Sequence, residues 1–119
     1  MKFDDAALLE ALDAAPAGML DTLPFGVIGL DGSGMVEVYN VYEATAARLT
    51  RDRVLGRHFF LDVAPCMNNS MVAERLEREE ALDSMLPYVL TFRMRVTPVR
   101  LRLLRAPGHR RRYVLVERS

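Results

Sequence analysis

The sequence is poor in the residues that build covalent and metal sites. It has one cysteine, Cys66, no tryptophan, and two histidines, His58 and His109. A single thiol excludes an internal disulfide, and so few thiol and imidazole groups exclude the usual zinc sites. No apolar run approaches the roughly 18 residues that a membrane span needs. The segment MKFDDAALLEALDAAP is acidic and amphipathic, unlike a targeting peptide. We therefore expect a soluble, cytoplasmic protein.

Charge is balanced overall but not along the chain. The 119 residues hold 16 basic and 16 acidic side chains, which excludes a generic polyanion binder, so neither nucleic acid nor membrane is an expected partner. Residues 91–119 nevertheless carry nine arginines and a single acid, Glu117. Two interpretations stay open. The arginines cover the wet face of a sheet, or they form a docking surface for an acidic partner or for the chain's own acidic N-terminal segment.

The first part of the chain is predicted to form a short N-terminal helical cap followed by a β-hairpin. Apolar residues at helical spacing predict a short helix in residues 1–22, a cap rather than part of the core. Residues 25–30 and 35–40 read as strands. The turn between them, Asp31-Gly32-Ser33-Gly34, supplies glycines for the positive φ values that hairpins need. Residues 41–55 favour short helices. Pro65 biases Ala64 toward extended backbone, so a helix in 59–66 should end before Cys66.

The second part reads as a helix and three strands. Apolar residues recur at helical spacing from 71 to 86, with Glu77, Glu79 and Glu80 on the solvated side. Alternation of apolar and polar residues predicts strands at 88–96, 99–105 and 112–118. In the first of these strands, one set of alternating side chains is expected to face the core: Leu90, Phe92, Met94 and Val96. Two strands, helices and three strands fit an α+β fold: a five-stranded antiparallel sheet with helices on one face and a short N-terminal helical cap. The domain limits expected are 1–22 for the cap and 23–119 for the main domain.

Enzymatic chemistry finds little support in the residues. His58 lies eight positions before Cys66, and nothing in the sequence places it as a base for that thiol. The glycines at 32 and 34 sit in a hairpin, not in a phosphate-binding loop between strand and helix. We therefore expect a protein that is not an enzyme.

A longer pattern points to a family. The run LDTLPFGVIGLDGSGMVEVYN, then Glu43, then VLGRHFFLDVAPC, resembles the photoactive yellow protein family, which comprises PAS-fold bacterial blue-light sensors. Thr97-Pro98 also matches. The resemblance implies a 4-hydroxycinnamic acid (p-coumaric acid) chromophore held as a thioester on Cys66. It further implies that the phenolate end accepts hydrogen bonds from Tyr39 and Glu43.

Physical chemistry explains those residue types. A thioester needs a thiol, and a buried phenolate needs donors because an unpaired buried charge is prohibitive. Glutamic acid donates only when protonated, and burial beside an anion favours that neutral form, so we expect Glu43 to be neutral in the dark. Light would isomerise the chromophore, and proton transfer from Glu43 would leave a carboxylate without a partner. That penalty would loosen the fold, and the N-terminal cap would open first.

The chain departs from the family's pattern within the expected pocket. Ala64 and Phe92 match it. Ala47 stands where a threonine is common and Leu49 where an arginine is common. Met94 replaces a usual tyrosine, and Val96 replaces a methionine that helps the chromophore reset. We expect an altered absorption maximum and slow recovery in the dark.

Two other functions remain open. The chain could be a PAS-type interaction or ligand-sensing module without chromophore, or a redox sensor that uses a reactive Cys66. The photoreceptor interpretation implies an unknown downstream signalling protein as partner, and a monomer or weak homodimer.

Overall fold

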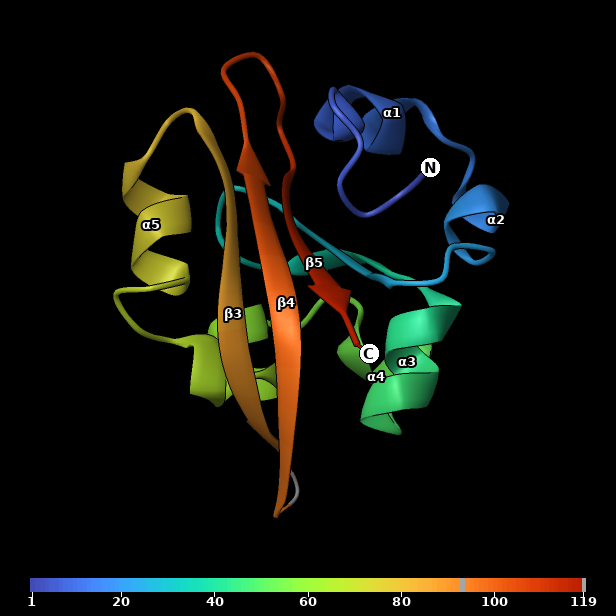
Figure 1. Cartoon of the computed structure of the whole chain (residues 1–119), viewed down its shortest axis with the longest axis vertical. Helices are drawn as coiled ribbons and strands as arrows, with labels where there is room; N and C mark the ends of the chain where they lie inside the picture. Colours follow the sequence, from blue (N-terminus) through green and yellow to red (C-terminus); the bar gives the residue numbers. More distant parts are fainter. Residues whose placement is uncertain (93, 119) are drawn as a thin grey trace.

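One antiparallel sheet organises the molecule. The computed structural model describes residues 1–92 and 94–118, and of Phe92 the backbone alone. The five strands lie in the order β2-β1-β5-β4-β3 (Figure 1). Their bounds are β1 Gly26–Leu30, β2 Val36–Tyr39, β3 Leu82–Phe92, β4 Arg95–Arg105 and β5 Arg112–Glu117. The helices are α1 Leu8–Ala14, α2 Ala17–Leu20, α3 Val41–Ala47, α4 Arg51–Val54 and α5 Ala73–Arg78, with two single turns, η1 Phe59–Val63 and η2 Pro65–Met67.

The two faces of the sheet bury separate apolar clusters. Successive strand residues point to opposite faces, so Leu103 joins the cluster under α3 to α5 while its neighbour Leu104 joins the cluster on the other side. The predicted α+β fold, with helices on one face and an N-terminal cap, is therefore confirmed.

The cap contributes more to the core than expected. Leu8, Leu9 and Leu12 of α1 are at most 5% exposed and pack with Tyr113 and Leu115 of β5. In Figure 1, α1 lies to the right of strands β3 to β5 and α5 to their left, and the two helices pack with different apolar clusters. The expectation of a cap outside the core is wrong, because the second face of β1 and β5 carries Val27, Tyr113 and Leu115 and needs an apolar cover.

Polar contacts fix the N-terminal segment to the sheet. Arg102 of β4 donates to the carbonyl oxygens of Phe3 and Asp5 at 2.9 and 2.7 Å, and forms a two-pronged pair with Asp83 of β3. Asp13 of α1 accepts from the Tyr113 hydroxyl at 2.6 Å. Docking of the chain's own N-terminal segment thus accounts for part of the basic sheet, mainly through carbonyl groups rather than acidic side chains.

The Asp83–Arg102 pair gives a pH-dependent prediction. The Arg102 guanidinium lowers the pKa of Asp83 below its ordinary value of 3.8. The pair therefore stabilises the fold at neutral pH, and that contribution is lost as the pH falls through the lowered value. We expect Asp83→Asn to cost about 1 kcal/mol at pH 7, a modest figure because Asp83 is 57% exposed. Urea unfolding at pH 7 and pH 3 measures this.

The matched control is Asp52→Asn, which removes an exposed acid of α4 and should change stability by less than about 0.5 kcal/mol. An Asp83→Asn penalty of the same size at both pH values would contradict the assignment.

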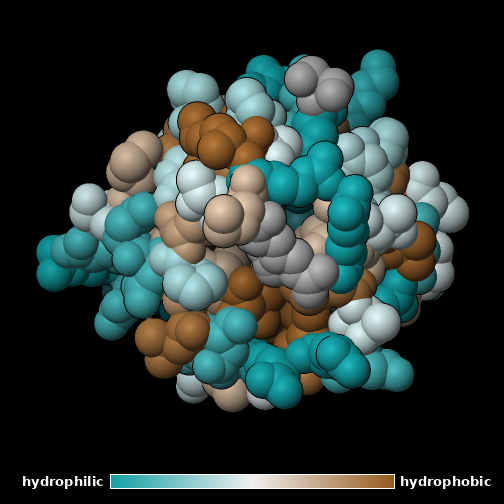
Figure 2. Space-filling view, turned by 90° about the horizontal axis from the view of Figure 1, so that it is seen from below, coloured by the Kyte–Doolittle hydropathy of each residue, from teal (hydrophilic) through white to brown (hydrophobic). Residues whose placement is uncertain are grey.

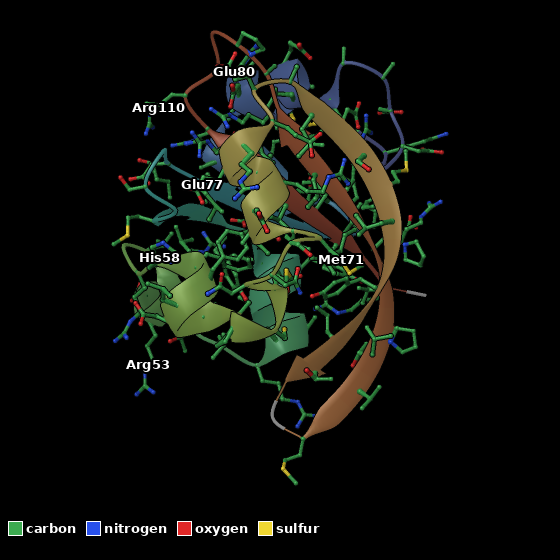
Figure 3. All side chains as sticks on the ribbon, turned by 90° about the vertical axis from the view of Figure 1, so that its left-hand side faces the viewer. Arg53, His58, Met71, Glu77, Glu80 and Arg110 are labelled. Carbon is green, nitrogen blue, oxygen red and sulfur yellow. The ribbon has the colours of Figure 1, made fainter. Side chains whose placement is uncertain are left out.

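Two sequence-based boundaries are wrong. The helix predicted over 71–86 ends at Arg78, and Leu82 begins β3, where it pairs with Arg105. A short apolar run fits both the helical and the strand period, and residues 82–86 form a strand because they pair with β4. The solvated side was predicted correctly for Glu77 and Glu80, which are exposed; Figure 3 shows both on or just after α5.

The strand predicted over 88–96 is also wrong, because the chain turns within it. Phe92 pairs with Arg95, so the chain reverses direction between β3 and β4, and Met94 lies there at φ 66°. Residues that pair across a hairpin share a face. Thr97 therefore lies on the face of Leu90, and Val96 on that of Thr91. Val96 is 71% exposed and Met94 fully exposed, contrary to the predicted inward row.

Candidate functional site

A pocket of about 370 Å³ lies between α3, the turns η1 and η2, and the tip of the β3–β4 hairpin. Figure 2 looks onto the end of the molecule that carries this tip, where hydrophobic surface lies in the middle and hydrophilic residues frame it. The lining is largely apolar. Its polar members are one thiol, one phenol, one threonine hydroxyl, one carboxyl and three guanidinium groups: Cys66, Tyr39, Thr97, Glu43, Arg48, Arg95 and Arg118.

Asn40 positions the two predicted ligands of the phenolic end. Tyr39 is the last residue of β2, and Glu43 lies in the first turn of α3. Between them, Asn40 is 1% exposed and caps α3, accepting from the Glu43 amide at 3.2 Å and the Val27 amide at 2.9 Å. Its side-chain NH₂ donates to two carbonyl oxygens, one at the end of α2 and one in the loop just before β1. The Asn40 side chain therefore fixes the first turn of α3 against β1 and directs the Glu43 side chain inward.

Cys66 lies in a tightly bonded turn. In η1 the Ala64 amide bonds to the Phe59 carbonyl at 2.7 Å, which makes a wide π turn of a kind often found at functional sites. Pro65 then starts η2, which contains Cys66. The first helix does end before Cys66, at Val63, but a second short one begins at Pro65, because proline fits the first position of a helix.

A neighbouring strand fixes the backbone of this turn. The Tyr88 hydroxyl of β3 donates to the Cys66 carbonyl oxygen, and the Asn69 side chain donates to both the Tyr88 oxygen and that carbonyl, at 2.7 and 3.3 Å. The thiol side chain is partly buried and faces the pocket.

Gly26 makes room for the Glu43 side chain. A Cβ atom at position 26 would lie 2.1 Å from Glu43 Oε1 and 3.0 Å from its Cδ. Any residue larger than glycine at this point of β1 would displace the carboxyl group. Glycine is thus required here by a close approach.

Glu43 has a strong partner that the sequence analysis did not identify. Arg118 Nη1 and Nη2 donate to Glu43 Oε1 and Oε2 at 2.7 and 3.1 Å, and the two side chains are 17% and 6% exposed. Burial by itself lowers the pKa of Arg118, but the Glu43 carboxylate outweighs it and the net pKa is raised. The structure therefore shows an ion pair between Glu43 and Arg118. A neutral Glu43 beside a bound phenolate stays a prediction.

Tyr39 is suited to donate a hydrogen bond. Burial raises the pKa of its phenol well above the ordinary value, the Glu43 charge raises it further, and Arg118 opposes the rise. The phenol therefore keeps its proton at neutral pH.

The structure brings together most of the predicted site residues. Six of the eight line this one pocket: Cys66, Tyr39, Glu43, Ala64, Ala47 and Leu49. The Phe92 side chain lies outside the described part of the chain. Val96 is not among the described lining residues, because the turn at Met94 places it on the outer face. Thr97 and Arg95 line the pocket instead of Val96, which alternation predicts to face inward.

Arg118 could have been found from strand periodicity. Val114 and Val116 point into the cluster under the helices, and Arg118 follows at the same alternation. Gly26 pairs with Val116, so Arg118 lies just beyond the glycine that accommodates Glu43. The charge pattern by itself indicates only a surface role for the basic C-terminal segment.

Solved structures define the class of protein. A PAS domain of an HTR-like protein from Haloarcula marismortui matches with a TM-score of 0.64 at 17% identity, covering 93% of each chain. No protein-family model matches the chain. Among the described residues, no helix combines the length and hydrophobicity needed to cross a bilayer. By its fold the protein is a PAS domain.

Closer relatives narrow the class to a family. The photoactive yellow protein of Rhodothalassium salexigens is 30% identical over 109 residues, covering 89% of this chain and 87% of that protein. The one of Halochromatium salexigens is 36% identical over 90 residues, covering 73% and 72%. The photoactive yellow protein domain of the sensor histidine kinase Ppr from Rhodospirillum centenum superposes with a TM-score of 0.84 at 31% identity, covering 92% and 99%. This chain belongs to the photoactive yellow protein family and is a photoreceptor-like, sensory PAS protein.

Proposed function

We propose that the protein is a blue-light photoreceptor that carries 4-hydroxycinnamic acid as a thioester on Cys66. One observation carries this proposal: in a member of this family, a single pocket is lined by Cys66, Tyr39 and Glu43. A sensor rather than an enzyme is the function that this arrangement supports best.

The residues present fit such a group. Ligand pockets usually measure roughly 300–1,000 Å³ and combine apolar walls with a few placed polar groups. This pocket, at about 370 Å³, suits one aromatic ring and a short chain. Its phenol and carboxyl suit a phenolic oxygen, and its thiol suits an acyl carbon.

Cys66 supplies the attachment. Its thiolate attacks the carbonyl carbon of an activated acyl donor, such as an acyl thioester or anhydride; a C–S bond forms and the donor's leaving group departs with the electron pair. When bound, the group supplies absorption of visible light and trans–cis isomerisation. The hydrogen bonds from Tyr88 and Asn69 to the Cys66 carbonyl hold this backbone fixed, so that motion is confined to the far end of the pocket.

Tyr39 and Glu43 hold the oxygen at the other end. Tyr39 donates through its phenol. Beside a buried phenolate, a second anion on Glu43 would be strongly disfavoured, so Glu43 takes up a proton in the dark and donates as well. After isomerisation, Glu43 would be placed to give that proton to the phenolic oxygen and would then be a carboxylate.

The fold responds to the new charge. Moving that proton would break the hydrogen bond from Glu43 to the phenolic oxygen, and a change of a few kcal/mol inside the domain is a large part of a total stability of about 5–15 kcal/mol. The N-terminal segment, held to the sheet by Arg102 and Tyr113, is the element expected to open first. Amide exchange in residues 1–22 should rise under illumination, and identical exchange in dark and light would contradict this step.

Reconstitution tests the attachment. Purified chain treated with activated 4-hydroxycinnamate should gain the mass of one acyl group and absorb blue light, and Cys66→Ser should show neither. Cys66→Ser with Ser70→Cys is the matched control, because it returns a thiol to an exposed position outside the pocket lining. A wild-type chain that stays colourless would favour an interaction or ligand-sensing module without chromophore.

Ala47 and Leu49 give a spectral prediction. Both line the pocket, and neither side chain can donate a hydrogen bond. In the double variant Ala47→Thr, Leu49→Arg, a hydroxyl and a cation enter the surroundings of the phenolic end. We expect its absorption maximum and recovery rate to differ measurably from those of the wild type. Indistinguishable spectra would contradict a role for positions 47 and 49 in tuning.

A further inference from the structure

Arg118 and Glu43 form a shielded ion pair at the wall of the pocket. The contact is two-pronged, at 2.7 and 3.1 Å, which matches the fork of a guanidinium to the two oxygens of a carboxylate. Both side chains are largely out of solvent, at 17% and 6% exposure. Salt and water therefore weaken this pair far less than a surface pair.

Other groups hold the pair in place. Gly26 backs the Glu43 carboxyl on one side, and the Tyr42 ring lies 5.9 Å from the Arg118 guanidinium carbon on the other. Tyr39 lies close enough for the Glu43 charge to raise the pKa of its phenol. Arg48 and Arg95 line the same pocket, and Glu43 is the one acid among its described lining residues. The other charged side chains that line the pocket around Glu43 are thus positive.

This arrangement corrects the expectation of a carboxylate without a partner. An ionised Glu43 in this chain meets a guanidinium positioned by β5 and by Tyr42, with no movement of the backbone. A paired carboxylate persists inside a protein, whereas an unpaired one is driven to take up a proton.

We propose that Arg118 receives the Glu43 carboxylate when that group loses its proton, and so sets how long the light-activated state lasts. The inference rests on the proposed photoreceptor function for its consequence in light. The pairing itself is seen in the structure and can be tested without an acyl donor. Arg118 acts through Glu43, as a positioning residue, and the recovery of the dark state requires that this pair be broken and Glu43 be protonated again.

The first test uses the full chain purified without acyl donor. At pH 7, Arg118→Gln should leave Glu43 buried without a cation, and infrared spectra should then show the C=O stretch of one protonated carboxyl. The band should be missing from the wild type and from the double variant Arg118→Gln, Glu43→Gln. Melting temperature should fall by on the order of 10 °C in Arg118→Gln, and by much less when Glu43→Gln is already present.

The second test uses reconstituted protein. Arg118→Gln should recover in the dark at least about tenfold faster than the wild type, because the ionised Glu43 has lost its partner and regains a proton more readily. Arg118→Lys, which keeps the charge but not the fork, should lie between the two. Arg78→Gln removes an arginine that is 76% exposed on α5 and should leave the recovery rate unchanged.

The outcomes separate the two proposals. A missing carboxyl band and additive melting shifts in the chain without chromophore would overturn the pairing. A confirmed pairing with unchanged recovery would overturn the role of Arg118 in light. A wild type that never becomes coloured would overturn the photoreceptor function, and the light role with it, while the band and the melting shifts would still establish the pair.

Discussion

Gly26→Ala should disrupt the site more than any other change of a single methyl group. Its Cβ would lie 2.1 Å from Glu43 Oε1. The end of the Glu43 side chain must then move, and the two-pronged contact with Arg118 breaks. Breaking a buried ion pair costs roughly 3–5 kcal/mol, so we expect a loss of about 3 kcal/mol in unfolding free energy. Reconstituted Gly26→Ala should also show a shifted absorption band, since Glu43 no longer reaches the phenolic end.

Gly18 provides the matched control. It lies in α2, and a Cβ atom at this position would have no neighbour within 4 Å. Gly18→Ala should leave stability unchanged or raise it by about 0.5–1 kcal/mol, because alanine favours helices. Urea denaturation measures both variants. Equal stabilities for Gly26→Ala and wild type, with an unshifted band, would show that Glu43 does not lie against β1.

Asn40→Ala should cost about 3–5 kcal/mol. The side chain is 1% exposed and makes four hydrogen bonds, two donated and two accepted. Alanine leaves buried amide and carbonyl groups without partners, at roughly 1–3 kcal/mol for each such group, and removes the cap of α3. Because α3 carries Glu43, the change should also shift the absorption band of the reconstituted protein.

The control for Asn40 is Asn68→Ala. Asn68 is exposed in the loop after η2, and its replacement should change stability by less than about 0.5 kcal/mol. Chemical denaturation with a circular dichroism readout distinguishes the two. A cost below about 1 kcal/mol for Asn40→Ala would contradict the view that this side chain joins α3 to β1.

Local signals predicted the first hairpin correctly. The Asp31 side chain accepts from the amides of Ser33 and Met35, and Gly34 has φ 85°, so the turn is specified within five residues. The family resemblance of the run that ends at Cys66 implied that Tyr39, Glu43 and Cys66 share a site. In the structure, all three residues line one pocket.

Long-range pairing could not be predicted in the same way. The segment 79–86 satisfies helical spacing, and only its register with β4 makes it a strand. The turn at Met94 reverses which residues face inward, so Val96 was assigned to the wrong side. Arg118 is far from Glu43 in sequence, and their contact depends on the register between β1 and β5.

A crystal structure of the reconstituted protein in the dark tests the central claim most directly. The account predicts continuous density from Cys66 Sγ to an aromatic ring, with the ring oxygen within hydrogen-bond distance of Tyr39 Oη and a Glu43 carboxyl oxygen. A pocket that stays empty after reconstitution, or a Glu43 side chain turned outward into solvent, would contradict it.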